Sequence, residues 1–120
     1  MLIKKLKDCR EITAGDGTRL RELLHPGSDA AAIRCSLAVA WVAPGKQSRP
    51  HRLKTAEVYY VVSGSGTMHI GDEAAAVSTG DAVYIPPGSV QWLENAGSDD
   101  IEFACIVDPA WRPEDEEIVQ

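Results

Sequence analysis

The sequence predicts an all-β domain folded as a small antiparallel barrel, and two observations favour it. Short segments rich in Val, Ile, Tyr, Trp and Ala recur along the chain, and clusters of turn-forming residues separate them. The main clusters are AGDG at 14–17, HPGSD at 25–29, APGKQSRP at 43–50, SGSG at 63–66, PPGS at 86–89 and NAGSDD at 95–100. Many short strands divided by such turns are typical of β-sandwiches and barrels.

Individual strands show the expected alternation of side chains. Alternate residues from 33 to 41 are Ile, Cys, Leu, Val and Trp, which places them on one face of a strand. Glu57, Tyr59 and Val61 share a face of a later strand in the same way. The segment DAVYIPP must end as a strand at its double proline, because proline has no N–H to donate. Only the C-terminal PAWRPEDEEI indicates a short helical turn.

The length of 120 residues fits a single domain spanning 1–120. We expect N-terminal strands within 1–32, a core barrel over about 33–108 and a C-terminal tail over 109–120. The acidic run at 114–117 is interpreted as a solvated part of that tail. A chain of this size can build its core without a metal or disulfide bonds, so a metal would serve binding or chemistry.

Charge and cysteine content limit the partners and the location. The formal net charge of −6 argues against nucleic acid or an anionic membrane as a partner. The three cysteines are odd in number and lack CxxC spacing, and the N-terminus MLIKKLKDCREI has no apolar stretch typical of a signal peptide. We therefore expect a cytoplasmic protein.

Two motifs carry a resemblance to the cupin family. Gly45, His51, Leu53, Glu57 and Gly64 have the spacing of the first cupin motif, G-(x)5-H-x-H-(x)3–4-E-(x)6-G.

The second cupin motif, G-(x)5-P-x-G-(x)2-H-(x)3-N, matches the spacing of Gly80, Pro86, Gly88, Gln91 and Asn95. The resemblance covers residues 33–108 and implies a cupin barrel, also described as a double-stranded β-helix or jelly roll.

The resemblance also implies a metal position that this chain has altered. Cupins typically bind a divalent metal through three histidines and one glutamate. His51 and Glu57 are kept, whereas Leu53 and Gln91 stand where the motif has its second and third histidines. In one interpretation His51, Glu57 and Gln91 hold a weakly bound metal, and these nitrogen and oxygen donors suit Mn, Fe, Ni or Zn. In the other, Glu57 accepts a hydrogen bond from His51 or Gln91, and the barrel holds an organic ligand or nothing.

Two functions therefore stay open at the level of sequence. The first is a metal-dependent enzyme, isomerase-like or lyase-like, that acts on a small oxygen-rich substrate such as a sugar or keto acid, with Glu57 or Tyr59 moving a proton. The second is a metal-free barrel that binds or senses a ligand without catalysis. A dioxygenase is a third, weaker alternative. In each case the partner is a small molecule, and the resemblance together with the open edges of a small barrel favours a homodimer.

Overall fold

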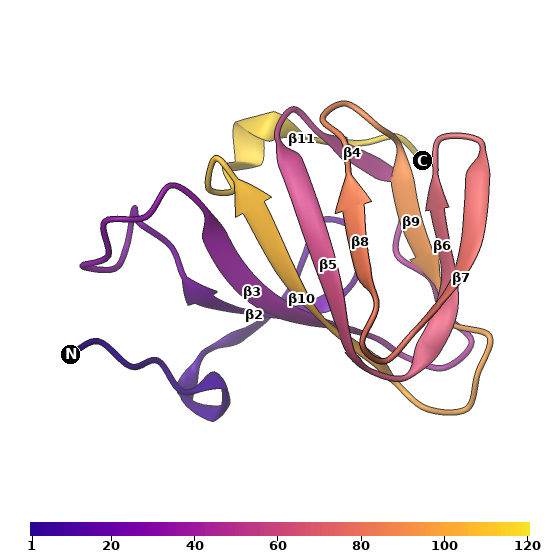
Figure 1. The fold of residues 1–120 in the computed structure, drawn as a ribbon, viewed down its shortest axis with the longest axis horizontal. Coiled ribbons are helices and arrows are strands. Elements are labelled where there is room, and N and C mark those ends of the chain that lie inside the picture. Colours follow the sequence, from indigo (N-terminus) through magenta and orange to yellow (C-terminus); the bar gives the residue numbers. More distant parts are fainter.

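The computed structural model describes residues 1–120 and contains eleven strands in two sheets that pack face to face (Figure 1). The larger sheet has the strand order β1-β2-β3-β10-β5-β8, and the smaller has β11-β4-β9-β6-β7. All the strand pairings are antiparallel. The predicted all-β fold is therefore confirmed.

The strand bounds follow the order of the chain. The larger sheet is built from Glu11–Thr13 (β1), Arg19–Leu24 (β2), Ser36–Val42 (β3), Ala56–Ser63 (β5), Ala82–Ile85 (β8) and Ile101–Asp108 (β10). The smaller sheet is built from His51–Leu53 (β4), Ser65–Ile70 (β6), Glu73–Ser78 (β7), Gln91–Glu94 (β9) and Glu116–Ile118 (β11). Two single-turn 3-10 helices lie at Leu6–Asp8 and Pro113–Asp115. Neither has the length needed to cross a bilayer.

The core lies between the sheets because alternate residues of the central strands point inward. In β10, Ile101, Phe103, Cys105 and Val107 are buried, and the residues between them are more exposed. Of these, Ile101, Phe103 and Cys105 join Val61 of β5 and residues from both sheets in one apolar cluster. Gly66 is required where the strands come close, since a Cβ there would lie 2.3 Å from the Glu94 carbonyl oxygen.

The third strand explains why the barrel is not completely filled. β3 begins at Ser36, three residues later than the alternation from Ile33 indicates. Ser36, Ala38 and Ala40 alternate with the apolar face seen in the sequence and line the cavity between the sheets. Because these side chains are small, they leave space in front of the larger sheet.

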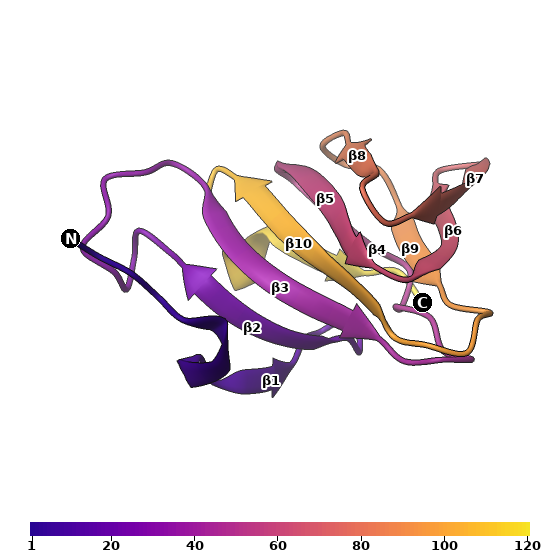
Figure 2. The same ribbon diagram turned by 60° about the horizontal axis from the view of Figure 1, so that its bottom comes forward.

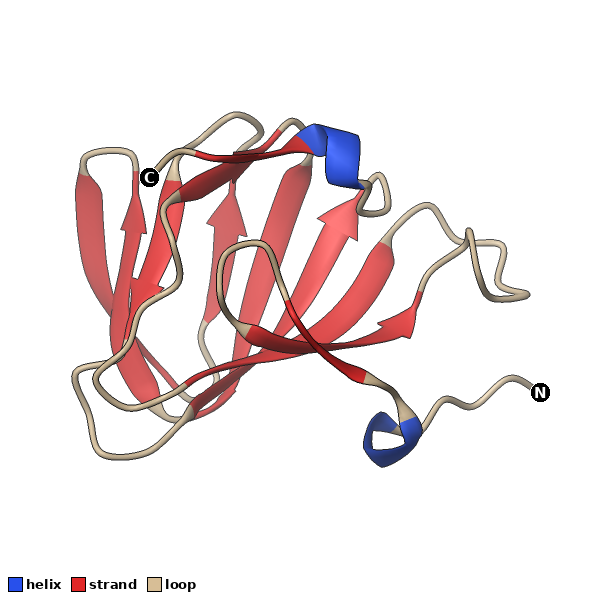
Figure 3. Ribbon diagram, turned by 180° about the vertical axis from the view of Figure 1, so that it is seen from behind, coloured by secondary structure: helices blue, strands red, loops and turns tan.

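Both ends of the chain cover this space. The β1–β2 hairpin extends the larger sheet beyond β3 (Figure 2), and its turn lies in front of that sheet when the molecule is seen from behind (Figure 3). The Arg49 N–H donates to the Asp16 carbonyl oxygen at 2.7 Å and anchors the turn. At the other end, β11 pairs with β4, so the tail is an edge strand of the smaller sheet.

Candidate functional site

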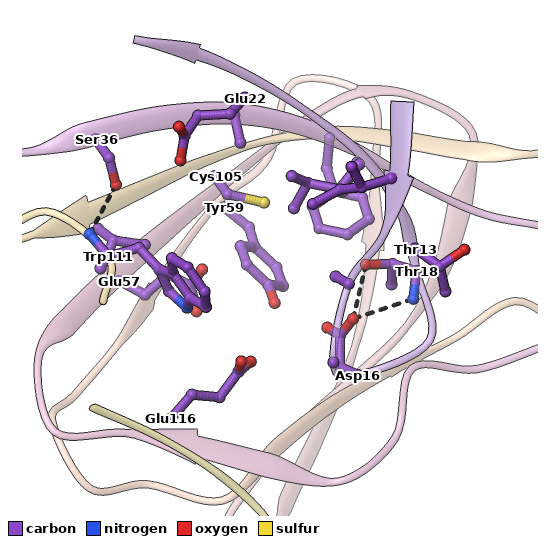
Figure 4. Close-up of a pocket in the computed structure, with 18 of the residues that line it drawn as sticks. Thr13, Asp16, Thr18, Glu22, Ser36, Glu57, Tyr59, Cys105, Trp111 and Glu116 are labelled. Carbon is purple, nitrogen blue, oxygen red and sulfur yellow. Dashed lines mark hydrogen bonds between the residues drawn. The ribbon is translucent and has the colours of Figure 1, made fainter. Parts of the chain in front are cut away.

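A cavity of about 670 Å³ lies between the two sheets, below the N-terminal turn. His51 and Leu53 reach it from β4, and Glu57 and Tyr59 reach it from β5. Its other walls come from the small side chains of β3 and from Phe103, Cys105 and Val107 of β10. Figure 4 shows polar groups from several elements facing one common space.

His51 is buried, and its ring is held in one orientation. Nδ1 lies 2.7 Å from the Arg49 carbonyl oxygen, which can only accept, so Nδ1 carries the hydrogen. Nε2 is then the nitrogen with a free lone pair in the neutral ring. It faces the Asp16 carboxylate at 3.6 Å, longer than a hydrogen bond. The ring is therefore oriented to accept a proton from a molecule in the cavity.

Glu57 is buried in the cavity wall and bonded to Gln91. The Gln91 side-chain Nε2 donates to Oε1 of Glu57 at 2.9 Å. Burial raises the pKa of Glu57 to about 8, with smaller contributions from the negative charges of Asp16 and Glu116, while the hydrogen bond from Gln91 lowers it. At neutral pH this residue is therefore mainly a neutral carboxylic acid that can donate a proton.

Tyr59 directs its hydroxyl into the same space. Its ring packs against Phe103, with the centroids 4.6 Å apart, and the side chain is buried. Figure 4 shows the hydroxyl pointing into the cavity, and no protein group makes a hydrogen bond with it. Burial, followed by the charge of Glu57, raises the pKa of Tyr59 well above its usual value, so the phenol keeps its proton. The hydroxyl is thus a free donor for a ligand oxygen.

Two cavity carboxylates come from the ends of the chain and were not predicted. Asp16 lies in the β1–β2 turn, where its Oδ1 accepts from the backbone N–H and the hydroxyl of Thr18 at 3.0 and 2.7 Å. Glu116 of β11 points into the cavity, and burial raises its pKa. The interpretation of residues 114–117 as a solvated run is therefore wrong in part, because Glu116 is half-buried and the buried Asp115 is bonded to Arg112.

The predicted site residues are arranged differently from a set of metal ligands. Glu57 and Gln91 meet directly, and His51 is paired with Gln91 in the strand register. His51, Glu57 and Tyr59 all line the cavity, but Gln91 is not among the lining residues. Gln91 is fully buried, its Oε1 has no hydrogen-bond partner, and it contributes by holding Glu57.

Metal binding by His51, Glu57 and Gln91 stays a prediction from the motif, and the structure does not fit it well. Gln91 presents its amide nitrogen to Glu57, and a protonated amide nitrogen is not a ligand. Leu53 occupies the position of a second imidazole and lines the cavity with an apolar side chain. No cluster of three or more His, Cys, Asp or Glu side chains is placed to hold a metal ion.

The sequence and the fold both match known proteins. The family model described as "Cupin domain" matches residues 38–107, which is more than half of the chain. The chain belongs to the cupin family. This cupin is 37% identical over 106 residues to an uncharacterized protein of Methanocaldococcus jannaschii, a match covering 88% of the present chain and 84% of that protein.

Two further relatives are named for their activity. The match to dimethylsulfoniopropionate lyase DddW of Ruegeria pomeroyi is 36% identical over 86 residues, covering 72% of this cupin and 55% of the lyase. The match to 1-hydroxy-2-naphthoate 1,2-dioxygenase of a Nocardioides species is 34% identical and covers 83% of this cupin but only 26% of the dioxygenase. This cupin therefore corresponds to about half of the lyase and a quarter of the dioxygenase.

Solved structures show the same fold at low sequence identity. The polyketide cyclase RemF of Streptomyces resistomycificus has a TM-score of 0.83 at 21% identity, over 100% of this cupin and 86% of that chain. The Streptomyces nucleoside dehydratase Pac13 has a TM-score of 0.78 at 19% identity, over 100% of this cupin and 92% of that chain. These likenesses confirm the predicted cupin barrel.

Proposed function

We propose that this cupin is an enzyme that binds a small oxygen-rich molecule in its cavity and catalyses an elimination or an isomerisation by acid–base chemistry. The observation that carries the proposal is a neutral carboxylic acid, Glu57, in the same cavity as an imidazole with a free Nε2, His51. A proton donor and a proton acceptor held in one cavity are the two groups that such reactions need.

Each residue has a defined part in the proposed elimination. His51 Nε2 takes the proton from the carbon next to a carbonyl group, and the electron pair of that bond forms a carbon–carbon double bond. The bond to a hydroxyl group on the following carbon breaks, and Glu57 gives its proton to the departing oxygen, so that water leaves. Tyr59 donates a hydrogen bond to the carbonyl oxygen, where negative charge develops. In an isomerisation the same groups move one proton from carbon to oxygen or to a neighbouring carbon.

The known relatives support a reaction of this class. One relative is named as a lyase, and it is 36% identical to this cupin over 72% of the length of this cupin. Another is named as a dioxygenase, but the cavity residues described above favour proton transfer. The metal-free binding barrel is the second candidate, and the apolar Leu53 in place of a ligand favours it.

The test is a screen for proton abstraction in deuterated water. Small sugars, hydroxy acids, hydroxy ketones and hydroxylated amines are incubated with the protein, and loss of water or uptake of deuterium is followed by mass spectrometry. We expect at least one compound to react, and His51→Gln and Glu57→Gln to lower its rate by roughly 10²–10⁴-fold. His69→Gln is the matched control, because His69 stacks on Trp92 and does not line the cavity.

Each outcome of the screen decides between the candidates. Turnover that survives His51→Gln in a folded protein overturns the acid–base proposal. Binding without turnover of any compound favours the non-catalytic barrel. If a chelator abolishes turnover and added metal restores it, the protein is the metal-dependent enzyme of the first alternative.

We further propose a cytoplasmic homodimer. All three cysteines are free, which supports a reducing compartment. The outer face of the larger sheet carries the exposed apolar side chains of Tyr60, Val62, Tyr84 and Ile106, which supports pairing of two copies through this face.

A further inference from the structure

Five acidic residues line the cavity: Asp8 is exposed at the first 3-10 helix, and the other four come from separate elements. Asp16 comes from the β1–β2 turn, Glu22 from β2, Glu57 from β5 and Glu116 from β11. Figure 4 shows the Tyr59 hydroxyl pointing toward the side of the cavity where Asp16 and Glu116 lie, with Glu22 farther away beside Ser36. A set assembled from such distant parts of the chain does not follow from any local run of acidic sequence.

Several acidic groups outside this space are paired with lysine or arginine, whereas the four described above are not; Asp16 faces only His51, at 3.6 Å. Outside the cavity Asp29 is bonded to Lys4, Asp100 to Arg19, Asp115 to Arg112 and Glu117 to Arg52. No lysine or arginine forms an ion pair with the four cavity carboxyl groups. Among the basic residues that line the cavity, Lys4 is held by Asp29 and Arg10 is exposed. The positive charge missing from the cavity is one that a ligand can supply.

A second, independent feature of the cavity also indicates a ligand. The Tyr59 side chain is 4% exposed, its hydroxyl has no protein partner, and that hydroxyl points toward the side of the cavity where Asp16 and Glu116 lie. A hydroxyl that faces a cavity and has no protein partner is free to bond a ligand or water there. The Trp111 indole also lines the cavity, and an aromatic face beside carboxylates favours an ammonium group.

We propose that the substrate is a small cation that also carries a carbonyl and a hydroxyl group, such as an amino sugar in its open-chain form. Its positive group lies between Asp16 and Glu116, near the face of Trp111, and one of its oxygens accepts a hydrogen bond from Tyr59. The same carboxyl groups repel anions, so sugar phosphates and simple organic acids are excluded as substrates. This inference rests on the proposed function, because it names the substrate class of the same site.

The test compares molecules of similar size and shape that carry a positive charge, no charge or a negative charge. Two matched sets are used, glucosamine with glucose and glucuronate, and benzylamine with benzyl alcohol and benzoate. Binding to the full chain is measured by NMR titration of the Trp111 indole N–H, which is assigned with Trp111→Phe. We expect the amine of at least one set to bind at least 10-fold more tightly than the alcohol or neutral sugar, and the carboxylate not to bind.

Variants locate the charge that is responsible for the preference. Asp16→Asn and Glu116→Gln should each lower the amine-to-neutral affinity ratio several-fold, and the double variant should bring it close to one. Glu117→Gln is the matched control, since Glu117 is the next residue of β11 but is exposed and bonded to Arg52. It should leave the ratio unchanged.

Several results would overturn the inference. The first is binding of a neutral or anionic member as tight as, or tighter than, binding of its amine. The second is that no member shifts the Trp111 signal. The third is that Mg²⁺, Mn²⁺ or Zn²⁺ alone shifts this signal in a manner that depends on Asp16 and Glu116, while the amines do not shift it. If a neutral compound binds best and its turnover still requires His51 and Glu57, the charge inference fails and the proposed function stands. If amines bind best but no compound reacts, the cation site stands and the proposed enzyme does not.

Discussion

Replacing Glu57 by glutamine should make the protein more stable at neutral and alkaline pH. The folded chain keeps this carboxyl group in the cavity wall, where burial raises its pKa from 4.5 to about 8. In the unfolded chain the group ionises near its ordinary pKa. Between pH 4.5 and pH 8 the folded state therefore holds a proton that the unfolded state has lost.

This difference in proton binding sets how the free energy of unfolding changes with pH. A raised folded-state pKa gives stability that is fully present below pH 4.5 and is lost as the pH rises to about 8. Each pH unit in this window costs about 1.4 kcal/mol, which amounts to about 3 kcal/mol by pH 7 and about 5 kcal/mol by pH 8.5. Glutamine cannot ionise, and its Oε1 still accepts the hydrogen bond from Gln91. Glu57→Gln should thus match the parent at pH 4.5 and exceed it by these amounts at higher pH.

The assay is urea unfolding followed by tryptophan fluorescence at pH 4.5, 6, 7 and 8.5, with the free energy of unfolding extrapolated to water. The difference between variant and parent isolates Glu57, because every other titrating group is present in both. Glu73→Gln, at an exposed position on β7, controls for the loss of a negative charge alone. Parallel pH profiles for the parent and Glu57→Gln would refute the reasoning, because they would mean that Glu57 is not protonated in the folded protein near pH 7.

Three further predictions follow from named contacts. Leu53→His should increase the affinity for Mn²⁺, Ni²⁺ or Zn²⁺ in calorimetric titrations, because it adds an imidazole beside His51 on the cavity wall. If a folded variant gains no affinity, residue 53 does not face the place where the motif puts the metal. Gly66→Ala should lower stability by about 3 kcal/mol, since its Cβ would overlap the Glu94 carbonyl oxygen, and an unchanged free energy of unfolding in urea would contradict this. Tyr84→Asp, on the outer face of β8, should shift sedimentation from dimer to monomer, and a parent that already sediments as a monomer would remove the proposed dimer.

The fold was predictable because its signals are local and repeated. The alternation of Glu57, Tyr59 and Val61 is visible in the sequence, and in the structure all three side chains are buried on one face of β5. The proline that ends β8 and the glycines of the tight turns have backbone requirements that other residues do not meet. Short-range rules of this kind identify strands and turns without knowledge of what packs on them.

The site was only partly predictable because its carboxyl groups meet through long-range contacts. Asp16 lies in a turn that reads as AGDG, and Glu116 lies in an acidic run, and neither pattern differs from that of a solvated surface segment. They reach the cavity because the Arg49 N–H holds the N-terminal turn and because β11 pairs with β4. The prediction for Gln91 took the position from the motif, but the rotamer and the bond to Glu57 depend on atoms that no spacing specifies.

The two departures from the cupin motif change the chemistry of the glutamate that remains. Beside a divalent metal, a carboxylate is held in its ionised form by the adjacent positive charge. In this chain an apolar side chain and a neutral amide stand at two of the imidazole positions, so burial dominates and the Glu57 pKa rises to about 8. The same side chain thereby changes from a ligand that needs a cation to an acid that can release a proton. Leu53 and Gln91 are in this sense active changes, since Leu53 adds an apolar side chain to the cavity wall and Gln91 donates a hydrogen bond of 2.9 Å to Glu57.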